Sequence, residues 1–270
     1  MPLAMAKIIF ITGTDTGVGK TVVTALLLRH LRQAGCNALA IKPFCSGSRA
    51  DARLLRSLQK NSLTLDEINP FFFTKPTAPA AAVGRRKAIP LDTVLRKIGA
   101  VGRRCDVLLV EGIGGLLVPL GKHYTVADLI LRLHCPTLIV CRNRLGTINH
   151  ALLTVKALQT IGLKRLGIVM VKDKKPDISA FSNPKIIRKM APSSPVFLIP
   201  NLGSRASSAG VIKRNAIFLK KTLAQIVGDD ILTLFFRKKG GKDWSTKPVD
   251  NRFRMTSNVR NITKVSKMPS

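Results

Sequence analysis

A glycine-rich segment near the start of the chain has the residue types of a phosphate-binding loop. Residues 13–21 read Gly-Thr-Asp-Thr-Gly-Val-Gly-Lys-Thr and follow directly on an apolar run. Glycines let the backbone curl so that several N–H groups face one anion, and the N-terminal end of a following helix adds positive potential. In this pattern Lys20 would reach the β- and γ-phosphates of a nucleotide, and the Thr21 hydroxyl would bind Mg2+. Five residues separate Gly13 from Gly19, one more than in the strict motif, so a glycine turn without a ligand is the alternative.

Two carboxylates stand where a metal site can form. Glu111 follows the apolar run 107–110 and opens the sequence Glu-Gly-Ile-Gly-Gly. Ligands of parallel sheets bind at the carboxyl ends of the strands, and Mg2+ prefers oxygen ligands, so Glu111 is a candidate. A solvated carboxylate at a strand end is the alternative. Asp51 begins a predicted helix, where it would either bind the metal or cap the helix N-terminus.

A second lysine ends another apolar run. Lys42 is followed by Pro43, which stops the predicted strand, and by Ser46 and Gly47, which form a loop. A lysine at this strand end would point into the same crevice as Lys20. Two ammonium groups beside a triphosphate suit phosphoryl transfer, where charge stabilisation does much of the work. Considered alone, such a lysine is more often a surface residue.

Short apolar runs alternate with amphipathic stretches along the chain. Continuous Val/Ile/Leu runs suit strands that are covered on both faces, and their alternation with helices predicts a mostly parallel sheet. We therefore expect an α/β fold in three layers, with helices on both faces of the sheet, of the P-loop NTPase type. The predicted strands are 7–12, 38–42, 106–111, 136–141, 166–171 and 195–199, and the predicted helices are 20–34, 51–60, 91–101, 125–134, 147–161 and 207–227.

The composition limits the class of protein. The chain has 270 residues, 46% of them hydrophobic, which is enough for a buried core. No apolar stretch approaches the roughly 18 residues of a membrane-spanning helix, and residues 1–10 lack the pattern of a signal peptide. The five cysteines are odd in number and form no Cys-x-x-Cys pair, so a reducing, cytoplasmic location is expected.

The formal net charge of +31 would attract an anionic partner. The charge is spread along the chain, however, and no recognisable RNA- or DNA-binding motif accompanies it, so nucleic acid is not an expected partner. We divide the chain into a domain at 1–228 and a basic tail at 229–270. Within that tail, 237–270 is predicted to be disordered or to serve as an anion-seeking arm.

Several segments together resemble one enzyme family, the dethiobiotin synthases. In the order in which the family has them, these are 13–21, 42–47, 51–52, 111–115 and the sequence Arg-Asn-Arg-Leu-Gly-Thr-Ile-Asn-His at 142–150. The likeness covers roughly 7–227. The glycine-rich loop is shared by a large ATPase superfamily, whereas the segments at 42–47 and 142–150 are far more specific.

The resemblance implies an ATP-dependent ligase that closes a cyclic urea. Its substrates would be 7,8-diaminononanoate, CO2 and ATP, and its cofactor would be Mg2+. The product would be dethiobiotin, formed in biotin biosynthesis through a carbamate and a carbamic–phosphoric anhydride. A homodimer with the substrate site at the subunit interface is also implied.

The resemblance also assigns roles to residues. Lys20 and Lys42 would be catalytic, and Thr21, Asp51 and Glu111 would hold the metal. The nucleotide would contact these three side chains and Gly17, Val18, Gly19, Lys20, Val22, Gly112, Ile113, Gly114, Pro200, Asn201 and Leu202. The diamine would contact Ser46 and, from the partner subunit, Arg144, Gly146, Thr147 and Asn149. For Thr147, capping of the following helix is an alternative or an additional role.

One departure from the family bears on the choice of nucleotide, and two rival functions stay open. Val171 stands where the family usually has an asparagine that reads the adenine edge, which leaves the choice of nucleotide open. A related ligase of the cobyrinate diamide synthase type usually carries a glutaminase domain, for which the chain has no space after residue 227. A partitioning-type P-loop ATPase with non-specific DNA binding would suit the charge, but its loop usually carries an early lysine, which 13–18 lacks.

Overall fold

The computed structural model describes residues 6–83 and 88–228, all within one compact unit. The predicted tail at 229–270 lies outside the described residues. The strands are β1 (Lys7–Gly13), β2 (Ala38–Ile41), β3 (Phe44–Ser46), β4 (Phe71–Phe73), β5 (Val107–Glu111), β6 (Thr137–Asn143), β7 (Leu166–Lys172) and β8 (Val196–Ile199). The helices are α1 (Lys20–Gln33), α2 (Ala50–Leu58), α3 (Leu65–Ile68), α4 (Pro79–Val83), α5 (Leu91–Gly102), α6 (Val126–Leu133), α7 (Thr147–Thr160), the 3-10 helix η1 (Ile178–Phe181), α8 (Asn183–Met190), α9 (Ala209–Phe218) and α10 (Lys220–Gly228).

The main sheet is entirely parallel. Its strands lie in the order β2-β5-β1-β6-β7-β8, while β3 and β4 form a separate parallel pair. From β1 the chain goes first to β2 on one side and later to β6 on the other, so the direction of winding reverses beside β1. Such a reversal opens a crevice at the carboxyl ends of the strands, which is where parallel sheets bind ligands.

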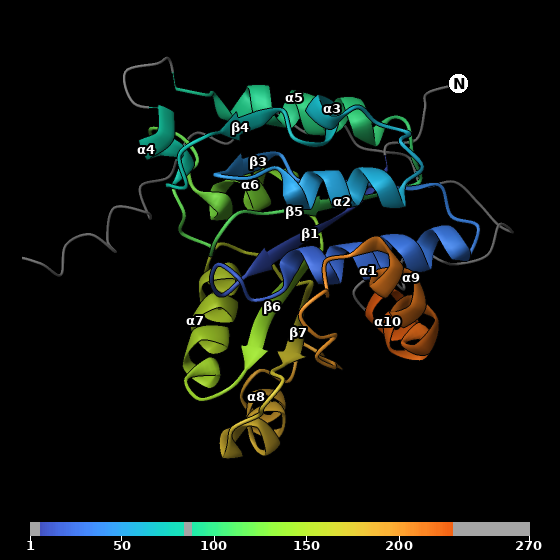
Figure 1. The fold of residues 1–270 in the computed structure, drawn as a ribbon. Helices are drawn as coiled ribbons and strands as arrows, with labels where there is room; N and C mark the ends of the chain where they lie inside the picture. Colours follow the sequence, from blue (N-terminus) through green and yellow to red (C-terminus); the bar gives the residue numbers. More distant parts are fainter. Residues whose placement is uncertain (1–5, 84–87, 229–270) are drawn as a thin grey trace, which may run out of the picture. The chain divides into compact units, whose positions relative to one another are not determined.

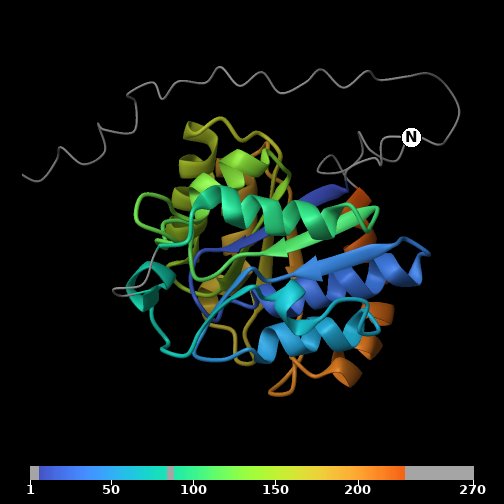
Figure 2. The same cartoon turned by 90° about the horizontal axis from the view of Figure 1, so that it is seen from above.

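Helices cover both faces of the sheet, as Figures 1 and 2 show. On one face α1 packs with α9 and α10, and α2 lies beside α1 next to the edge strand β2. The other face carries α5, α6, α7 and α8. Phe10, Leu109 and Ile139, on three neighbouring central strands, are fully buried between these layers. The predicted three-layer α/β fold is therefore confirmed. Within 6–83 and 88–228, no helix has both the length and the apolarity needed to cross a bilayer.

The predicted elements agree with the structure to within about two residues at each end, with one exception. The single helix predicted at 207–227 is wrong, because the segment divides at Leu219 into α9 and α10. Six elements were not predicted from the sequence: β3, β4, α3, α4, η1 and α8. Strands of three residues are too short to show a periodic pattern. For α3 a signal did exist, because Thr64 and Glu67 form a capping box at its start.

A buried glutamine completes the edge of the sheet at β2. Gln59, which is 0% exposed, accepts a hydrogen bond from the Ala40 N–H at 3.0 Å and donates one to the Ala40 carbonyl at 3.0 Å. These are the backbone groups that a further strand would otherwise pair. The side-chain amide thus takes the place of a neighbouring strand and satisfies two buried polar groups.

We expect Gln59→Met to lower the free energy of unfolding by about 2 to 4 kcal/mol, because methionine fills the same space but leaves both Ala40 groups without a partner. Urea denaturation measures this change. Gln33→Met, on the exposed end of α1, is the matched control and should change stability by less than about 0.5 kcal/mol. Equal stability of Gln59→Met and wild type would contradict the assigned role.

Candidate active site

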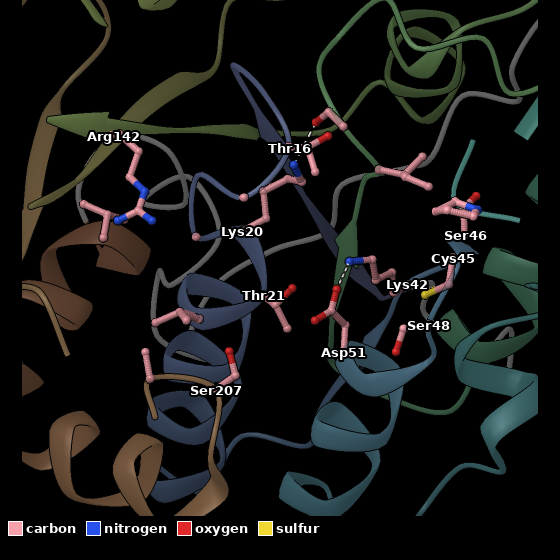
Figure 3. A pocket seen from close by; sticks show the side chains of 18 of the residues that line it. Thr16, Lys20, Thr21, Lys42, Cys45, Ser46, Ser48, Asp51, Arg142 and Ser207 are labelled. Atoms are coloured by element: carbon pink, nitrogen blue, oxygen red, sulfur yellow. Dashed lines mark hydrogen bonds and ion pairs between the residues drawn. The ribbon is translucent and has the colours of Figure 1, made fainter. Parts of the chain in front are cut away.

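A cavity of about 710 Å3 opens at the carboxyl ends of the central strands (Figure 3). The phosphate loop, the segment after β2, the start of α2, the loop after β5 and the segment after β8 all contribute to its walls. Of the predicted site residues, it is lined by Gly17, Gly19, Lys20, Thr21, Val22, Lys42, Ser46, Asp51, Ile113, Gly114, Pro200, Asn201 and Leu202. Val18 turns its side chain into the core instead, and Glu111 and Gly112 lie behind the cavity wall.

The phosphate loop has the backbone conformation that its glycines predict. Gly17 and Gly19 have φ angles of 71° and 105°, in the left-handed region that favours glycine. A β-carbon at Gly19 would also lie 3.2 Å from a methyl group of Val171. The next residue, Lys20, begins α1, so the N-terminal end of a helix of 14 residues faces the loop.

Lys20 ties the phosphate loop to the loop after β5. Its Nζ donates to the carbonyl oxygens of Asp15 at 2.7 Å and Gly114 at 2.8 Å. Burial lowers the pKa of Lys20 from 10.5 to about 8; the charge of Glu111 opposes this effect, and the charge of Lys42 reinforces it. An arriving phosphate would therefore supply the negative charge that the ammonium group lacks in its surroundings.

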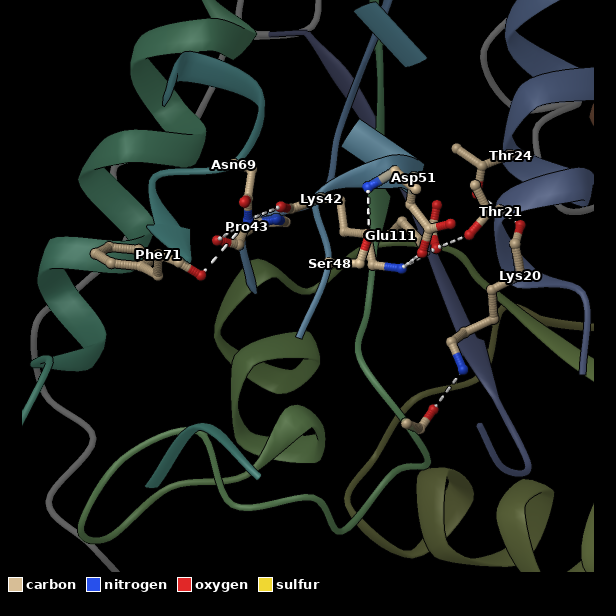
Figure 4. A network of polar contacts seen from close by, with 12 residues as sticks. Lys20, Thr21, Thr24, Lys42, Pro43, Ser48, Asp51, Asn69, Phe71 and Glu111 are labelled. Atoms are coloured by element: carbon tan, nitrogen blue, oxygen red, sulfur yellow. Dashed lines mark hydrogen bonds and ion pairs between the residues drawn. The ribbon is translucent and has the colours of Figure 1, made fainter. Parts of the chain in front are cut away.

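The carboxylate of Glu111 is the centre of the polar network (Figure 4). The side chain is buried, and its Oε1 accepts hydrogen bonds from the Thr21 hydroxyl at 2.6 Å and from Lys42 Nζ at 2.8 Å. Its Oε2 is buried and has no hydrogen-bond partner among the described residues. The predicted alternative of a solvated carboxylate therefore does not apply to this residue.

Lys42 is a buried lysine held by two carboxylates. Its Nζ bonds to Glu111 on one side and to Asp51 on the other. Burial by itself would lower the pKa of Lys42, but the charges of Glu111 and Asp51 raise it above its ordinary value. The ammonium group thus stays charged, and the alternative of a surface lysine does not describe Lys42.

Asp51 lies within the first turn of α2 rather than at its cap. The cap position is Arg49, whose side chain makes no capping hydrogen bond, and the Ser48 hydroxyl accepts a bond from the Ala50 N–H. The carboxylate of Asp51 instead points to Lys42 (Figure 3). The alternative of helix capping by Asp51 is therefore wrong.

The donors around Glu111 fit a magnesium ion. Thr21, Asp51 and Glu111 offer only oxygen, which is the ligand type that Mg2+ prefers, together with waters and phosphate oxygens. The buried Oε2 of Glu111 without a described partner adds an acceptor that a cation would satisfy.

The segment after β2 brings an unpaired hydroxyl and a thiol to the cavity. Ser46 Oγ is buried and has no hydrogen-bond partner among the residues described. Beside it in sequence, Cys45 lines the same wall, where burial raises the pKa of its thiol to about 12, so the thiol stays neutral. Ser46 therefore lines the cavity with a hydroxyl oxygen that has no partner among the described residues.

The far end of the cavity is formed by the segment after β8 and by β7. Asn201 donates to the Lys172 carbonyl at 3.3 Å and accepts from the Gly203 N–H at 2.8 Å. Val171 presents only methyl groups there, while Arg142 of β6 pairs with Asp173 at 2.7 Å. Of the residues that line this end, Arg142, Asn201 and Ser207 carry polar side chains, whereas Val171 does not.

Comparisons with known proteins identify the family. A family profile described as an AAA domain matches residues 7–206. An ATP-dependent dethiobiotin synthetase from Akkermansia muciniphila is 45% identical over 166 residues, which cover 60% of this chain and 78% of the relative. Those from Anaeromyxobacter sp. strain K and Bacillus subtilis are 41% and 37% identical, cover 76% and 78% of this chain, and are themselves covered to 96% and 92%. This chain belongs to the dethiobiotin synthetase family. A synthetase is a ligase, so the prediction of an enzyme is confirmed.

Solved structures share the fold of this dethiobiotin synthetase family member at greater distance. The MinC:MinD cell division protein complex of Aquifex aeolicus has a TM-score of 0.51 and 16% identity, over 89% of this chain and 100% of the other. A pNOB8 ParA bound to nonspecific DNA has a TM-score of 0.50 and 13% identity, over 84% and 100%. At such identities the likeness shows the fold alone, so it gives no support to the partitioning alternative.

One set of residues that the family resemblance assigns to the site lies outside the cavity of the same chain. Arg144, Gly146, Thr147 and Asn149 do not line it. Gly146, with φ 87°, occupies the cap position of α7, and Thr147 is the first residue inside the helix. The alternative of helix capping by Thr147 is therefore wrong. Within one chain, these four residues of the dethiobiotin synthetase family segment therefore contribute nothing to the wall of the cavity.

Several residues of the cavity wall were not predicted from the sequence. Thr16, Cys45, Ser48, Arg142 and Val118 line it, together with the segment 76–79 and Gly203, Ala206 and Ser207. Proximity to the glycine-rich loop was a usable signal for Thr16, and proximity to Ser46 was one for Cys45 and Ser48. The others depend on contacts between distant segments.

The buried charge of Lys20 should make stability depend on pH. Between about pH 8 and pH 10.5 the folded state has released the Lys20 proton and the unfolded state still holds it, so stability rises with pH in this window. Relative to Lys20→Met, wild type should gain about 2 to 3 kcal/mol across the window. Urea denaturation at both ends measures the gain, with Lys97→Met, on the exposed surface of α5, as the control variant. A constant difference between wild type and Lys20→Met would rule out this account of Lys20.

Proposed function

We propose that this chain forms dethiobiotin from 7,8-diaminononanoate, CO2 and ATP, with release of ADP and phosphate. One observation carries the proposal: in a member of the dethiobiotin synthetase family, two lysines and three oxygen donors gather in and directly behind the wall of one cavity. These are Lys20, Lys42, Thr21, Asp51 and Glu111.

The proposed reaction has three steps. One amine of the diamine adds to CO2 and loses a proton, which gives a carbamate. A carbamate oxygen then attacks the γ-phosphorus of ATP, forming a carbamic–phosphoric anhydride and expelling ADP. The second amine attacks the carbonyl carbon, the bond from that carbon to the phosphate oxygen breaks, and the urea ring closes with loss of a proton. Phosphorylation is needed because a carbamate is a poor electrophile until one of its oxygens becomes a leaving group.

The two lysines are suited to different parts of this reaction. Lys20, held by loop carbonyls at the start of α1, would stabilise the charge on the transferred phosphoryl group. Lys42 is held by Glu111 and lines the same cavity as Ser46. It would stabilise the carbamate and bring it to the phosphorus. Mg2+ held by Thr21, Asp51 and Glu111 would neutralise charge on the phosphate oxygens.

A homodimer would complete the site. The start of α7 carries backbone N–H groups suited to the substrate carboxylate, but it does not line the cavity of its own chain. Around it, large apolar side chains face solvent: Leu145 is 81% exposed, Leu153 60%, Ile178 89% and Phe181 83%. An exposed apolar surface of this kind is typical of a protein interface. A second copy of the chain would cover it and present α7 to the cavity.

The first functional test uses purified protein with ATP, Mg2+, bicarbonate and the diamine. We expect phosphate release that depends on the diamine, with dethiobiotin formed in equal amount. Lys42→Ala should lower turnover by about a hundredfold or more and leave the fold intact by circular dichroism, because it removes a charge at the reacting groups. Lys97→Ala, on the exposed surface of α5, is the matched control.

Two outcomes would count against the proposal. If phosphate release by the wild type does not depend on the diamine and the protein binds DNA in a salt-sensitive way, the partitioning alternative is favoured. If Lys42→Ala turns over at the wild-type rate, the role assigned to Lys42 is wrong.

Mixing two impaired variants, at a diamine concentration below the raised KM of Asn149→Glu, tests the shared site. Asn149→Glu adds a carboxylate to the exposed first turn of α7 and should repel the substrate carboxylate, raising the KM for the diamine. In a mixed dimer of Asn149→Glu and Lys42→Ala, one of the two sites keeps both wild-type segments. The mixture should therefore regain up to about a quarter of the wild-type turnover. No recovery, with mixed dimers shown by native mass spectrometry, would mean that each chain supplies its own α7.

A further inference from the structure

A buried asparagine holds the backbone that carries Lys42. Asn69 is 1% exposed, and its Nδ2 donates to the carbonyl oxygens of Lys42 at 3.0 Å and Pro43 at 3.2 Å (Figure 4). The amide therefore grips the two peptide groups that follow the end of β2. Neither carbonyl is paired within the main sheet, because β2 ends at Ile41.

Backbone contacts leave little freedom in the same segment. The Lys42 N–H donates to the Ile68 carbonyl at 2.9 Å, and the Phe71 N–H donates to the Pro43 carbonyl at 3.0 Å. Asn69 lies between these two contacts in sequence. The hydrogen bonds described here for the main-chain groups of Lys42 and Pro43 therefore all come from residues 68–71, between the end of α3 and the start of β4.

An arginine fixes the orientation of the Asn69 amide. Arg49 Nε donates to Asn69 Oδ1 at 3.1 Å, and Arg49 Nη2 donates to the Asn69 carbonyl at 2.9 Å. With Oδ1 facing a guanidinium, which only donates, Nδ2 must face the two carbonyls. Arg49 is also the cap residue of α2, whose first turn carries Asp51. One pair of side chains therefore connects the main chain of Lys42 with the start of the helix that bears its carboxylate partner.

We propose that Asn69 and Arg49 are positioning residues for the Lys42 amine. The inference rests on the proposed function of Lys42. A lysine side chain has four rotatable bonds, so the place of its amine depends on where the main chain is held as well as on its partners. Asn69 holds the main chain of Lys42 through the two carbonyl groups. Arg49 holds the start of α2, which carries Asp51, the partner of the amine. A displacement of about 1 Å at a reacting group can lower a rate about a hundredfold.

The test separates positioning from general stability. In Asn69→Ala we expect kcat to fall by about tenfold or more, because Lys42 loses its anchored backbone. The Kd of a non-hydrolysable ATP analogue should stay within about twofold, since Asn69 touches none of the phosphate-loop contacts described above. Gln59→Met is the matched control: Gln59 is also almost fully buried and bonds twice to the main chain of β2, at Ala40, two residues before Lys42. It should lower Tm and leave kcat within about twofold.

Arg49→Gln is the second variant, for use if Asn69→Ala fails to fold. Its side chain is partly exposed, so the fold should tolerate the change, and kcat should fall with the Kd of the analogue unchanged. Both variants break the contact between Arg49 and Asn69, so the loss of kcat in the double variant should be smaller than the product of the two single losses.

The outcomes distinguish this inference from the proposed function. If the wild type shows no diamine-dependent turnover, the proposed function is wrong. If the wild type is active and Asn69→Ala keeps its kcat, or loses kcat no more than Gln59→Met does, the positioning inference is overturned. The same holds if both Asn69→Ala and Arg49→Gln weaken binding of the analogue as much as they lower kcat.

Discussion

The arrangement of the site depends on one buried carboxylate. An ionised carboxylate away from water is costly unless donors surround it, so Glu111 requires partners at fixed positions. It obtains them from the segments that follow the two strands beside β5: Thr21 lies in the first turn of α1, which follows β1, and Lys42 follows β2. The strand order β2-β5-β1 therefore does more than bury apolar side chains. It brings three separate chain segments to one oxygen atom, and the cavity forms around them.

The same burial acts on the two lysines in opposite ways. Lys42 has Glu111 and Asp51 beside it, and its pKa is raised. Lys20 bonds only to carbonyl oxygens, and burial lowers its pKa to about 8. The charge of Lys42 is thus neutralised by two carboxylates. The charge of Lys20 lowers the stability of the fold until an anion binds beside it. Storing an unfavourable charge at a binding site is a known way to favour ligand over empty protein.

The sequence was sufficient for the parts of the molecule that depend on local patterns. Apolar runs gave the six strands of the main sheet, and the glycines with Lys20 and Thr21 gave the phosphate loop. What could not be predicted depends on tertiary contacts. The pairing of β3 with β4 involves only three residues on each strand. No local pattern in the sequence shows that the amides of Gln59 and Asn69 bond to the main chain, and only the folded chain places them against backbone groups of β2 and of the segment after it.

The two ends of the cavity differ in the polar groups that they present. One end is formed by the phosphate loop, and the other by Val171 and the segment after β8. At the phosphate end, left-handed glycines and Lys20 set the loop, and a side chain at Gly19 would meet Val171. At position 171 the family's asparagine is absent, and valine packs on that same glycine without offering a hydrogen bond. The amide of Asn201 is already engaged with its own backbone surroundings, and Arg142 is paired with Asp173. We therefore expect the binding of a nucleotide to rest on the phosphate loop and Lys20, whereas position 171 can offer a base no hydrogen bond at the other end.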